Sequence, residues 1–390
     1  MKVVFLSNYF NHHQSAISEC FYRLTKGEYW FIETQLIDDE RKNMGWEIDN
    51  YPQYIKRIYE SDDIKRECIE LINNADLVIT GSAPNYLLKE RLKANKLVFR
   101  YSERIYKKKG QRFEMPLRAI KYHFENKMSK NVYLLCSSAY AAGDYAVTGN
   151  FLKHTYKWGY FPEINSENDI NELMRNKNEA SILWAGRLIR WKHPEIVIDI
   201  AKKLKLENIK FKISIIGNGE LEDELKRSII ENKLEQNVNL LGAMKPYQVR
   251  EYMKKSQIFL FTSDYNEGWG AVLNEAMSSG CAVVTSHAIG AVPFLIQDGE
   301  NGLIYKNGDF NDIYNKVSLL LRNPELKTLY GLKAYNTIFS LWNENIAAER
   351  VLDLARNIIN GDKEPNIFVD GPCSKALIIK NRWYRKKKLK

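Results

Sequence analysis

Residues 257–285 read QIFLFTSDYNEGWGAVLNEAMSSGCAVVT, and this stretch alone predicts a strand, a helix and a second strand. A short apolar run at 257–262 leads into a polar loop, and a run rich in β-branched residues follows at 281–285. Between them lies a segment of helical character that ends at Gly280. Because two parallel strands need a crossover of this kind, the stretch predicts one βαβ unit of a parallel sheet.

The same alternation of short apolar strands and amphipathic helices continues on both sides of this stretch. Strands are expected at 2–7, 76–80, 96–100 and 132–136 in the first half, and at 181–185, 211–216, 237–241, 257–262 and 281–285 in the second. The predicted fold class is therefore α/β, with two doubly wound, Rossmann-like domains that face an interdomain cleft.

A polar segment rich in Asn and acidic residues separates the two halves of the chain and marks a domain boundary. The expected divisions are a first domain at 1–165, a linker at 166–179, a second domain at 180–340, a helix at 341–360 and a tail at 361–390. Since ligands of such sheets bind outside the carboxyl ends of the strands, candidate site residues are sought in the loops that follow them.

The formal net charge of +10 is concentrated in two segments, 104–130 and 375–390. Both segments mix Lys and Arg with large apolar residues, a combination that favours an anionic membrane surface as partner. A solvated helix face for the first segment and a frayed tail for the second remain open alternatives. Nucleic acid is disfavoured as a partner, because no recognised reading motif accompanies the charge.

The five cysteines are scattered and contain no C-x-x-C pair, which favours reduced thiols over a disulfide framework or a zinc site. The amino-terminal apolar run is too short for a signal peptide, and no segment approaches the ~20 apolar residues of a membrane span. We expect a cytoplasmic protein that, if it meets a membrane, does so at the inner face.

Within the opening stretch, EGWGAVLNE at 267–275 places two acids on either side of a helix start. Gly268 and Gly270 would let backbone N–H groups approach an anion, and the helix dipole would add to the attraction. Glu267 and Glu275 would then accept hydrogen bonds from hydroxyls on both sides of a diphosphate, as in a nucleotide sugar. An ordinary capping residue and an ordinary helix residue remain the alternative for the two acids.

Three further loops follow expected strands of the second half. Arg187 and Lys192 lie after 181–185, where two cations can neutralise a diphosphate leaving group. Gly217 begins a G-x-G that lacks the third glycine of a nicotinamide-binding loop, so that function is disfavoured. Gly242 and Met244 follow 237–241 and could offer backbone to a nucleotide base.

The runs GRLIRWKHPE, IIGNGE, LLGAMKP and SDYNEGWGAVLNEAMSSG, with the helix near 345–358, resemble the retaining glycosyltransferases of family 4. The E-x7-E element is the signature of that family, and the resemblance covers roughly residues 180 to 358. It implies the GT-B fold, a first domain that binds the acceptor, a second that binds the nucleotide sugar, and a final helix at 341–360 that crosses back onto the first.

The resemblance also implies roles for single residues. Arg187 and Lys192 match the pair that holds the donor diphosphate, while Glu267 matches the acid on the sugar hydroxyls. Glu275 matches the acid on the ribose. The whole implied donor site is Gly186, Arg187, Lys192, Gly217, Gly242, Met244, Glu267, Gly268, Trp269, Gly270, Ala271, Val272, Leu273 and Glu275. Trp269 stands where the family usually has phenylalanine.

The first domain matches the family weakly, and its candidate residues are fewer. His13, in the first loop, is a candidate to reach the cleft and act in catalysis, with a capping or surface role as the alternative. Arg100 and Glu103 are candidates to bind the acceptor. Four other histidines have no partner pattern and receive no role: His123, His154, His193 and His287.

The function implied is retaining, metal-independent transfer of a hexose from a nucleotide sugar, expected to be UDP-linked, to a saccharide acceptor. The acceptor is expected to be lipid-linked, in synthesis of a bacterial capsule, exopolysaccharide or O-antigen. No cofactor and no metal are expected, and the absence of a D-x-D motif agrees with that. Alternatives are a catalytically silent GT-B homologue that binds a partner or glycan, and another GT-B enzyme such as a sugar-nucleotide epimerase or a glycoside phosphorylase.

Overall fold

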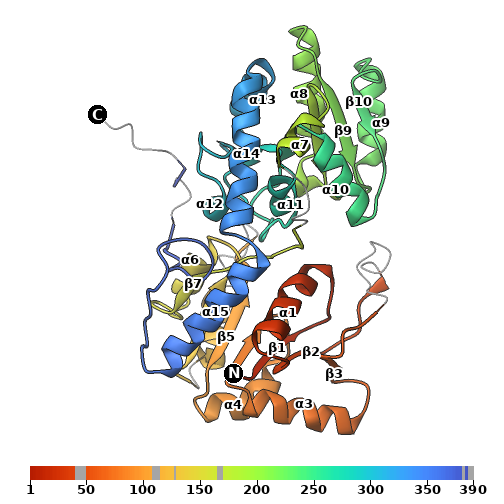
Figure 1. Cartoon of the computed structure of the whole chain (residues 1–390). Helices are drawn as coiled ribbons and strands as arrows, with labels where there is room; N and C mark the ends of the chain where they lie inside the picture. Colours follow the sequence, from red (N-terminus) through yellow and green to blue (C-terminus); the bar gives the residue numbers. More distant parts are fainter. Residues whose placement is uncertain (40–49, 108–114, 127–128, 165–169, 380–382, 385–390) are drawn as a thin grey trace, which may run out of the picture. The chain divides into compact units, whose positions relative to one another are not determined.

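The computed structural model describes residues 1–39, 50–107, 115–126, 129–164, 170–379 and 383–384 (Figure 1). The chain forms two compact units, each with a parallel sheet of its own. The first unit comprises Met1–Glu163 and Trp342–Ile379, and the second comprises Ile164–Leu341 and Lys380–Lys390.

The first unit is built on a seven-stranded sheet in which all pairings between strands are parallel. Its order is β3-β2-β1-β4-β5-β6-β7, with Val3 opposite Tyr29 on one side and Leu77 on the other. The strands are β1 (Val3–Ser7), β2 (Tyr29–Glu33), β3 (Ile55–Arg57), β4 (Leu77–Thr80), β5 (Val98–Ser102), β6 (Val132–Cys136) and β7 (Thr155–Lys157). The helices are α1 (His12–Leu24), α3 (Asp62–Asn74), η1 (Asn85–Leu88), α4 (Lys89–Lys93), α5 (Met115–Asn126), α6 (Ala141–Ala146) and α15 (Glu344–Ile359).

Local sequence explains where two of these helices begin. Asn11 caps α1 by accepting from the His13 backbone N–H, and the Gln14 side chain bonds back to the Asn11 N–H. Asn343 caps α15 by accepting from the Ile346 N–H. Although α15 is distant from α1 in sequence, it belongs to the first unit and packs against α1 (Figure 1).

The second unit contains a six-stranded parallel sheet of order β10-β9-β8-β11-β12-β13. Its strands are β8 (Ser181–Ala185), β9 (Lys212–Ile216), β10 (Val238–Leu240), β11 (Ile258–Phe261), β12 (Ala282–Ser286) and β13 (Leu303–Tyr305). Its helices are α7 (Ile170–Arg175), η3 (Arg190–Lys192), α8 (Glu195–Leu206), α9 (Glu222–Glu231), α10 (Pro246–Lys255), α11 (Val272–Ser278), α12 (Val292–Leu295), α13 (Phe310–Arg322) and α14 (Pro324–Ser340). Ile182, Ile213 and Ile258 from neighbouring strands lie in its apolar core.

All nine expected strands are present and overlap the expected ranges. Four others were not expected: β2, β3, β7 and β13. Helix α7 lies inside the stretch that was expected to be a linker, and its Leu173 is buried. None of the described helices is long and apolar enough to cross a membrane.

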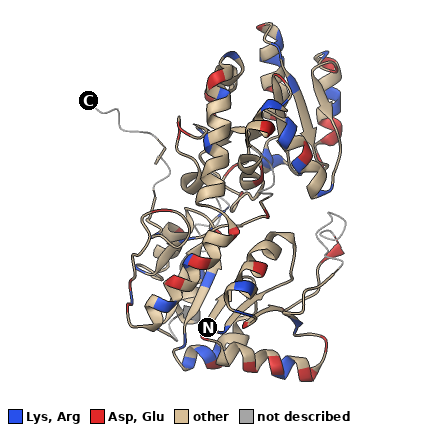
Figure 2. Cartoon of the chain, viewed as in Figure 1, with Lys and Arg blue, Asp and Glu red and all other residues tan. Residues whose placement is uncertain are grey.

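Positive and negative side chains are interspersed along the surface helices of both units, as Figure 2 shows for α3, α9 and α15. Of the two segments of concentrated positive charge, 108–114, 127–128, 380–382 and 385–390 lie outside the described residues. The described parts of these segments are 104–107, 115–126, which forms α5, 129–130, 375–379 and 383–384.

The described part of the tail is held against the first sheet, so the alternative of a frayed tail is wrong for these residues. Cys373 N–H donates to Lys157 O at 2.8 Å, and Ala376 N–H donates to Thr155 O at 3.0 Å. Lys375 forms an antiparallel bridge with Tyr156, and its ammonium lies 2.9 Å from the Tyr156 hydroxyl. The tail therefore covers the edge strand β7, whose backbone would otherwise be open to another chain.

Deletion of residues 371–390 should destabilise the first unit, because each lost backbone hydrogen bond contributes about 1 kcal/mol and apolar side chains become exposed. Thermal unfolding followed by circular dichroism measures the effect. A variant that lacks only 380–390 is the control and should keep the midpoint of the first unit. Equal midpoints for the two deletions would show that the tail does not stabilise β7.

Candidate active site

The order of strands in the second sheet reverses between β8 and β11, which are neighbours although three α-helices and two strands separate them in sequence. Ligands of open parallel sheets bind at such a reversal, outside the carboxyl ends of the strands. Two loops meet there. The Lys192 loop (186–194) follows β8, and the Glu267 loop (262–271) follows β11.

Close approach of backbones shapes the base of the Lys192 loop. Gly186 N–H donates to Ile216 O at 3.0 Å, and Gly217 N–H donates to Gly242 O at 2.8 Å. A Cβ on Gly217 would lie 1.8 Å from the Gly186 carbonyl oxygen, and the φ of Gly217 is +140°. Only glycine fits this position, so the G-x-G found in the sequence packs the loops after β8 and β9 together.

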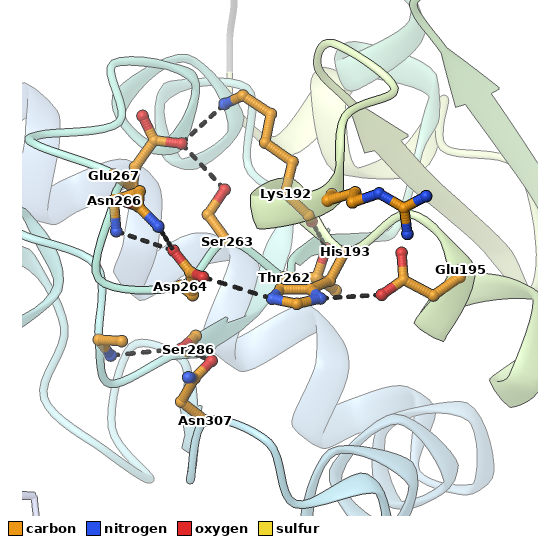
Figure 3. A network of polar contacts seen from close by, with 12 residues as sticks. Lys192, His193, Glu195, Thr262, Ser263, Asp264, Asn266, Glu267, Ser286 and Asn307 are labelled. Carbon is orange, nitrogen blue, oxygen red and sulfur yellow. Dashed lines mark hydrogen bonds and ion pairs between the residues drawn. The ribbon is translucent and has the colours of Figure 1, made fainter. Parts of the chain in front are cut away.

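A salt bridge joins the two loops: Lys192 Nζ lies 2.7 Å from Glu267 Oε2 (Figure 3). Ser263 Oγ donates to the same carboxylate oxygen at 2.9 Å. The two charged side chains are only 14% and 13% exposed, so their attraction is weakly screened. Two of the residues predicted from sequence to act on the donor are thus brought into contact, and Arg187 lies half-buried in the same loop.

His193 lies between two carboxylates, which no sequence pattern indicated. Its Nδ1 is 2.8 Å from Glu195 Oε1, and its Nε2 is 3.6 Å from Asp264 Oδ2 (Figure 3). Hydrogen bonds to Asp264 and Glu195 raise the pKa of His193 to about 9 although burial opposes the shift. Burial alone would raise the pKa of Asp264, but His193 and Asn266 outweigh it and hold that pKa below its usual value.

The backbone of His193 is unusual as well. Its φ of 52° and ψ of 51° place it in the left-handed region, between η3 and Pro194. This conformation costs an L-residue about 1–2 kcal/mol, so the surroundings must hold it.

His287 also has partners that the sequence did not suggest: its Nε2 lies 2.9 Å from the Tyr265 hydroxyl, and its Nδ1 accepts from Asn307 N–H at 3.0 Å.

Glu275 lies in the first turn of α11, where its Oε1 is 3.6 Å from Arg250 Nη1. Burial raises the pKa of Glu275 to about 7, and the Arg250 guanidinium only partly offsets this. Arg250, on α10, was not among the candidates, because an arginine on an amphipathic helix has no distinguishing sequence signal. Helix α11 has only seven residues, so its dipole contributes less at Gly268 and Gly270 than the sequence suggested.

The candidates in the Glu267 loop and at the start of α11 differ in how far their side chains are buried. The Trp269 side chain is completely buried and donates from Nε1 to Asn274 Oδ1 at 2.9 Å, and Leu273 is also fully buried. A Cβ on Gly270 would lie 2.6 Å from the Phe261 ring. The side chains of Trp269 and Leu273 therefore have no surface to offer a ligand, whereas Ala271, Val272 and, in the loop after β10, Met244 are half-buried.

In the first unit, His13 and Glu103 are linked through Tyr160. The rings of His13 and Tyr160 are stacked at 6.0 Å, and the Tyr160 hydroxyl donates to Glu103 Oε1 at 3.1 Å. Lys107 forms a salt bridge with the other oxygen of Glu103 at 2.6 Å. Arg100 is held elsewhere, donating from Nη1 to Asn85 Oδ1 at 2.8 Å.

No three His, Cys, Asp or Glu side chains within the described ranges lie close enough together to hold a metal ion.

Comparison with known proteins adds to this geometry. Residues 165–337 match the family model described as "Glycosyl transferases group 1". The matched range includes the Lys192 loop, the Glu267 loop and most of the second unit. The second unit is thus similar, over most of its length, to a glycosyltransferase domain.

Curated relatives match a part of the chain of similar length. An N-acetylgalactosamine-N,N'-diacetylbacillosaminyl-diphospho-undecaprenol 4-alpha-N-acetylgalactosaminyltransferase of Campylobacter jejuni is 37% identical over 155 residues, which are 39% of this chain and 40% of that protein. The amylovoran biosynthesis glycosyltransferase AmsK of Erwinia amylovora is 34% identical over 146 residues, 36% of this chain and 35% of that protein. The chain spans about half the length, or less, of the curated relatives it matches.

The likeness of the fold extends over both units. The crystal structure of Anabaena HepE in complex with UDP has a TM-score of 0.67 and 15% identity, and the match covers 92% of this chain and 100% of that chain. The fold is GT-B. The fold class expected from the sequence, two Rossmann-like α/β domains, is confirmed.

The raised pKa of Glu275 predicts how stability depends on pH. The folded state holds the Glu275 proton up to about pH 7, whereas the unfolded chain releases it near 4.5, so stability falls as pH rises through this window. Glu275→Gln should remove that loss and exceed the wild type at pH 8 by roughly 2–3 kcal/mol, with no such gain at pH 4. Urea unfolding at the two pH values measures it, with exposed Glu325→Gln as control.

Proposed function

We propose that the chain transfers a sugar from a nucleotide sugar, UDP-linked, to a saccharide acceptor. The observation that carries the proposal is the Lys192–Glu267 salt bridge, which lies at the strand-order reversal of a unit similar to glycosyltransferases. The structural neighbour HepE binds UDP, and this supports the choice of nucleotide.

The salt bridge describes the site before the donor binds. A diphosphate that enters beside Arg187 and Lys192 offers the ammonium a more highly charged partner than Glu267. Glu267 is then released to accept hydrogen bonds from sugar hydroxyls, while Ser263 continues to orient it. Charge builds on the departing diphosphate, so the two cations would lower the barrier mainly by electrostatic stabilisation.

The proposed stereochemical course is retention, with attack by the acceptor on the face that the diphosphate leaves. Once the donor is bound, Glu267 is proposed to accept hydrogen bonds from sugar hydroxyls and Asp264 stays paired with His193, so neither carboxylate is proposed as a covalent nucleophile. A phosphate oxygen of the donor would then take the acceptor proton. We propose that the reaction needs no metal, since Arg187 and Lys192 supply the positive charge.

The proposed acceptor is a lipid-linked saccharide of a bacterial surface polysaccharide. The Campylobacter relative carries diphospho-undecaprenol in its name, and the Erwinia relative is named for amylovoran biosynthesis. Within the first unit, we propose that His13 and Glu103 contact the acceptor, because Tyr160 links them at the carboxyl ends of the sheet. The interaction of Arg100 with Asn85 makes it a weaker candidate.

Substitution of either cation tests the donor site. Arg187→Ala and Lys192→Ala should each lower kcat/KM for the donor on the order of 100-fold to 1000-fold, because the leaving diphosphate loses a fixed positive charge. Turnover is measured as release of UDP from a panel of UDP-sugars with a lipid-linked acceptor. Lys202→Ala, which removes an exposed lysine of α8, is the matched control. Normal turnover in both site variants would contradict the proposal, and UDP binding without transfer in the wild type would favour a silent homologue.

The proposed membrane contact rests on helix α5. Leu117, Ile120 and Phe124 are spaced to lie on one face and are 74%, 55% and 65% exposed. Arg118 and Lys121 add positive charge to the same helix. An apolar stripe on a basic helix suits the interface of an anionic bilayer, where apolar side chains enter the boundary region and cations meet the headgroups.

Flotation with vesicles containing anionic phospholipid tests this surface. The wild type should float at low salt, and Leu117→Ser combined with Phe124→Ser should reduce the floating fraction about tenfold or more, because buried apolar area is lost. Leu206→Ser is the control, since Leu206 is 82% exposed but lies in the second unit. Equal flotation of the double variant and the wild type would rule out α5 as the contact.

A further inference from the structure

The Lys192 loop and the Glu267 loop are joined by more than their salt bridge. Asp264 N–H donates to Trp191 O at 3.0 Å, and Thr262 Oγ1 donates to Lys192 O. His193 adds the third connection through its ion pair with Asp264. The three contacts are consecutive along the Lys192 loop, so they fix the stretch of backbone from which the lysine ammonium extends (Figure 3).

The connection through His193 differs from the other two, because this residue contacts two further elements of the chain. It belongs to the turn after η3, Glu195 lies in the first turn of α8, and Asp264 lies in the Glu267 loop. Carboxylates only accept hydrogen bonds, and a neutral imidazole has a single N–H to donate. When Nδ1 donates to Glu195, Nε2 faces the Asp264 carboxylate at 3.6 Å, where a protonated nitrogen is attracted and a lone pair is repelled. The geometry therefore favours the imidazolium.

We propose that His193 is a positioning residue of the donor site. Its imidazolium, held between Glu195 and Asp264, fixes the positions of Lys192 and Glu267 relative to each other. This inference rests on the proposed glycosyl transfer, because it assigns His193 to the loops that would bind the donor. The left-handed backbone of His193 supports it. Glycine or asparagine would adopt that conformation more easily than histidine, so the backbone alone gives no reason for a histidine here.

The charged groups around the imidazole explain why it stays protonated. Glu195 faces it from α8 and Asp264 from the Glu267 loop, while the nearby Lys192 ammonium is paired with Glu267. The second Asp264 oxygen accepts from the backbone and side-chain N–H groups of Asn266, which keeps that carboxylate oriented. With its pKa raised to about 9, His193 carries charge at neutral pH, and the clamp is lost as pH rises through that value.

The test compares His193→Gly, His193→Asn and Asp264→Asn with the wild type. Gly and Asn accept the left-handed backbone more easily than histidine, which offsets part of the stability lost with the two ion pairs, so the variants should remain folded. kcat/KM for the UDP-sugar should fall on the order of 10-fold to 100-fold, the effect expected of an ångström-scale misplacement. The donor KM should rise in each variant, and the wild-type loss of kcat/KM near pH 9 should be absent in His193→Gly.

A second readout does not depend on turnover. In NMR spectra of the full chain, the His193 imidazole should titrate with a midpoint near 9, and Asp264→Asn should lower that midpoint by about one unit or more. Calorimetric titration with UDP should show weaker binding to the three variants than to Lys202→Ala, the control. Wild-type UDP affinity and kcat/KM in both His193 variants would overturn the inference.

The outcomes separate this inference from the proposed function. If Lys192→Ala abolishes transfer while the His193 variants keep wild-type rates and pH profiles, the proposed donor site is supported and the positioning role of His193 is contradicted. If Lys192→Ala itself has no effect on transfer, the proposed function is contradicted. A lowered unfolding midpoint in His193→Gly, with donor KM unchanged, would assign His193 to stability alone and would also overturn the inference.

Discussion

In a parallel sheet all strands end at the same edge, and in the second unit the order of strands reverses between β8 and β11. The connections after these strands lead away in opposite directions along the sheet, and their first loops meet at the reversal. Arg187 and Lys192 come from one loop and Glu267 from the other. The order of the strands thus brings these charges together, and Lys192 and Glu267 form a short salt bridge there.

Backbone packing holds this arrangement before any side chain contributes. Gly217 approaches the Gly186 carbonyl more closely than any Cβ would permit, and Gly270 lies against the Phe261 ring. Buried Trp269 then fills the space behind the Glu267 loop and is bonded to Asn274. The loops are rigid at their bases, so the side chains at their tips can be aligned by a few polar contacts of modest strength.

Much of the fold could be predicted because buried parallel strands have a strong local signal. The missed strands show where that signal fails. β3 and β7 include Lys or Arg among their three residues, and β2 contains Tyr29 and Trp30, so these strands lack the usual aliphatic run. β13 is apolar but has only three residues, whereas β10, of the same length, lies within a longer run of strand character at 237–241. The tail was misjudged for a related reason. Its bonds to β7 join residues more than 200 positions apart in sequence, and no local pattern reports such a pairing.

The candidate site was predicted as far as spacing and loop position allow. Glu267, Lys192 and Glu275 could be proposed because their positions follow strands or begin a helix, whereas Arg250 and His193 make contacts that only the fold brings about. The two acids of the EGWGAVLNE stretch also turn out to be chemically different. Glu267 is paired with an ammonium at 2.7 Å, whereas Glu275 is buried with a guanidinium 3.6 Å away and a pKa of about 7. Near neutral pH, Glu275 is therefore able to donate a hydrogen bond as well as accept one, which Glu267, paired with an ammonium, is not placed to do.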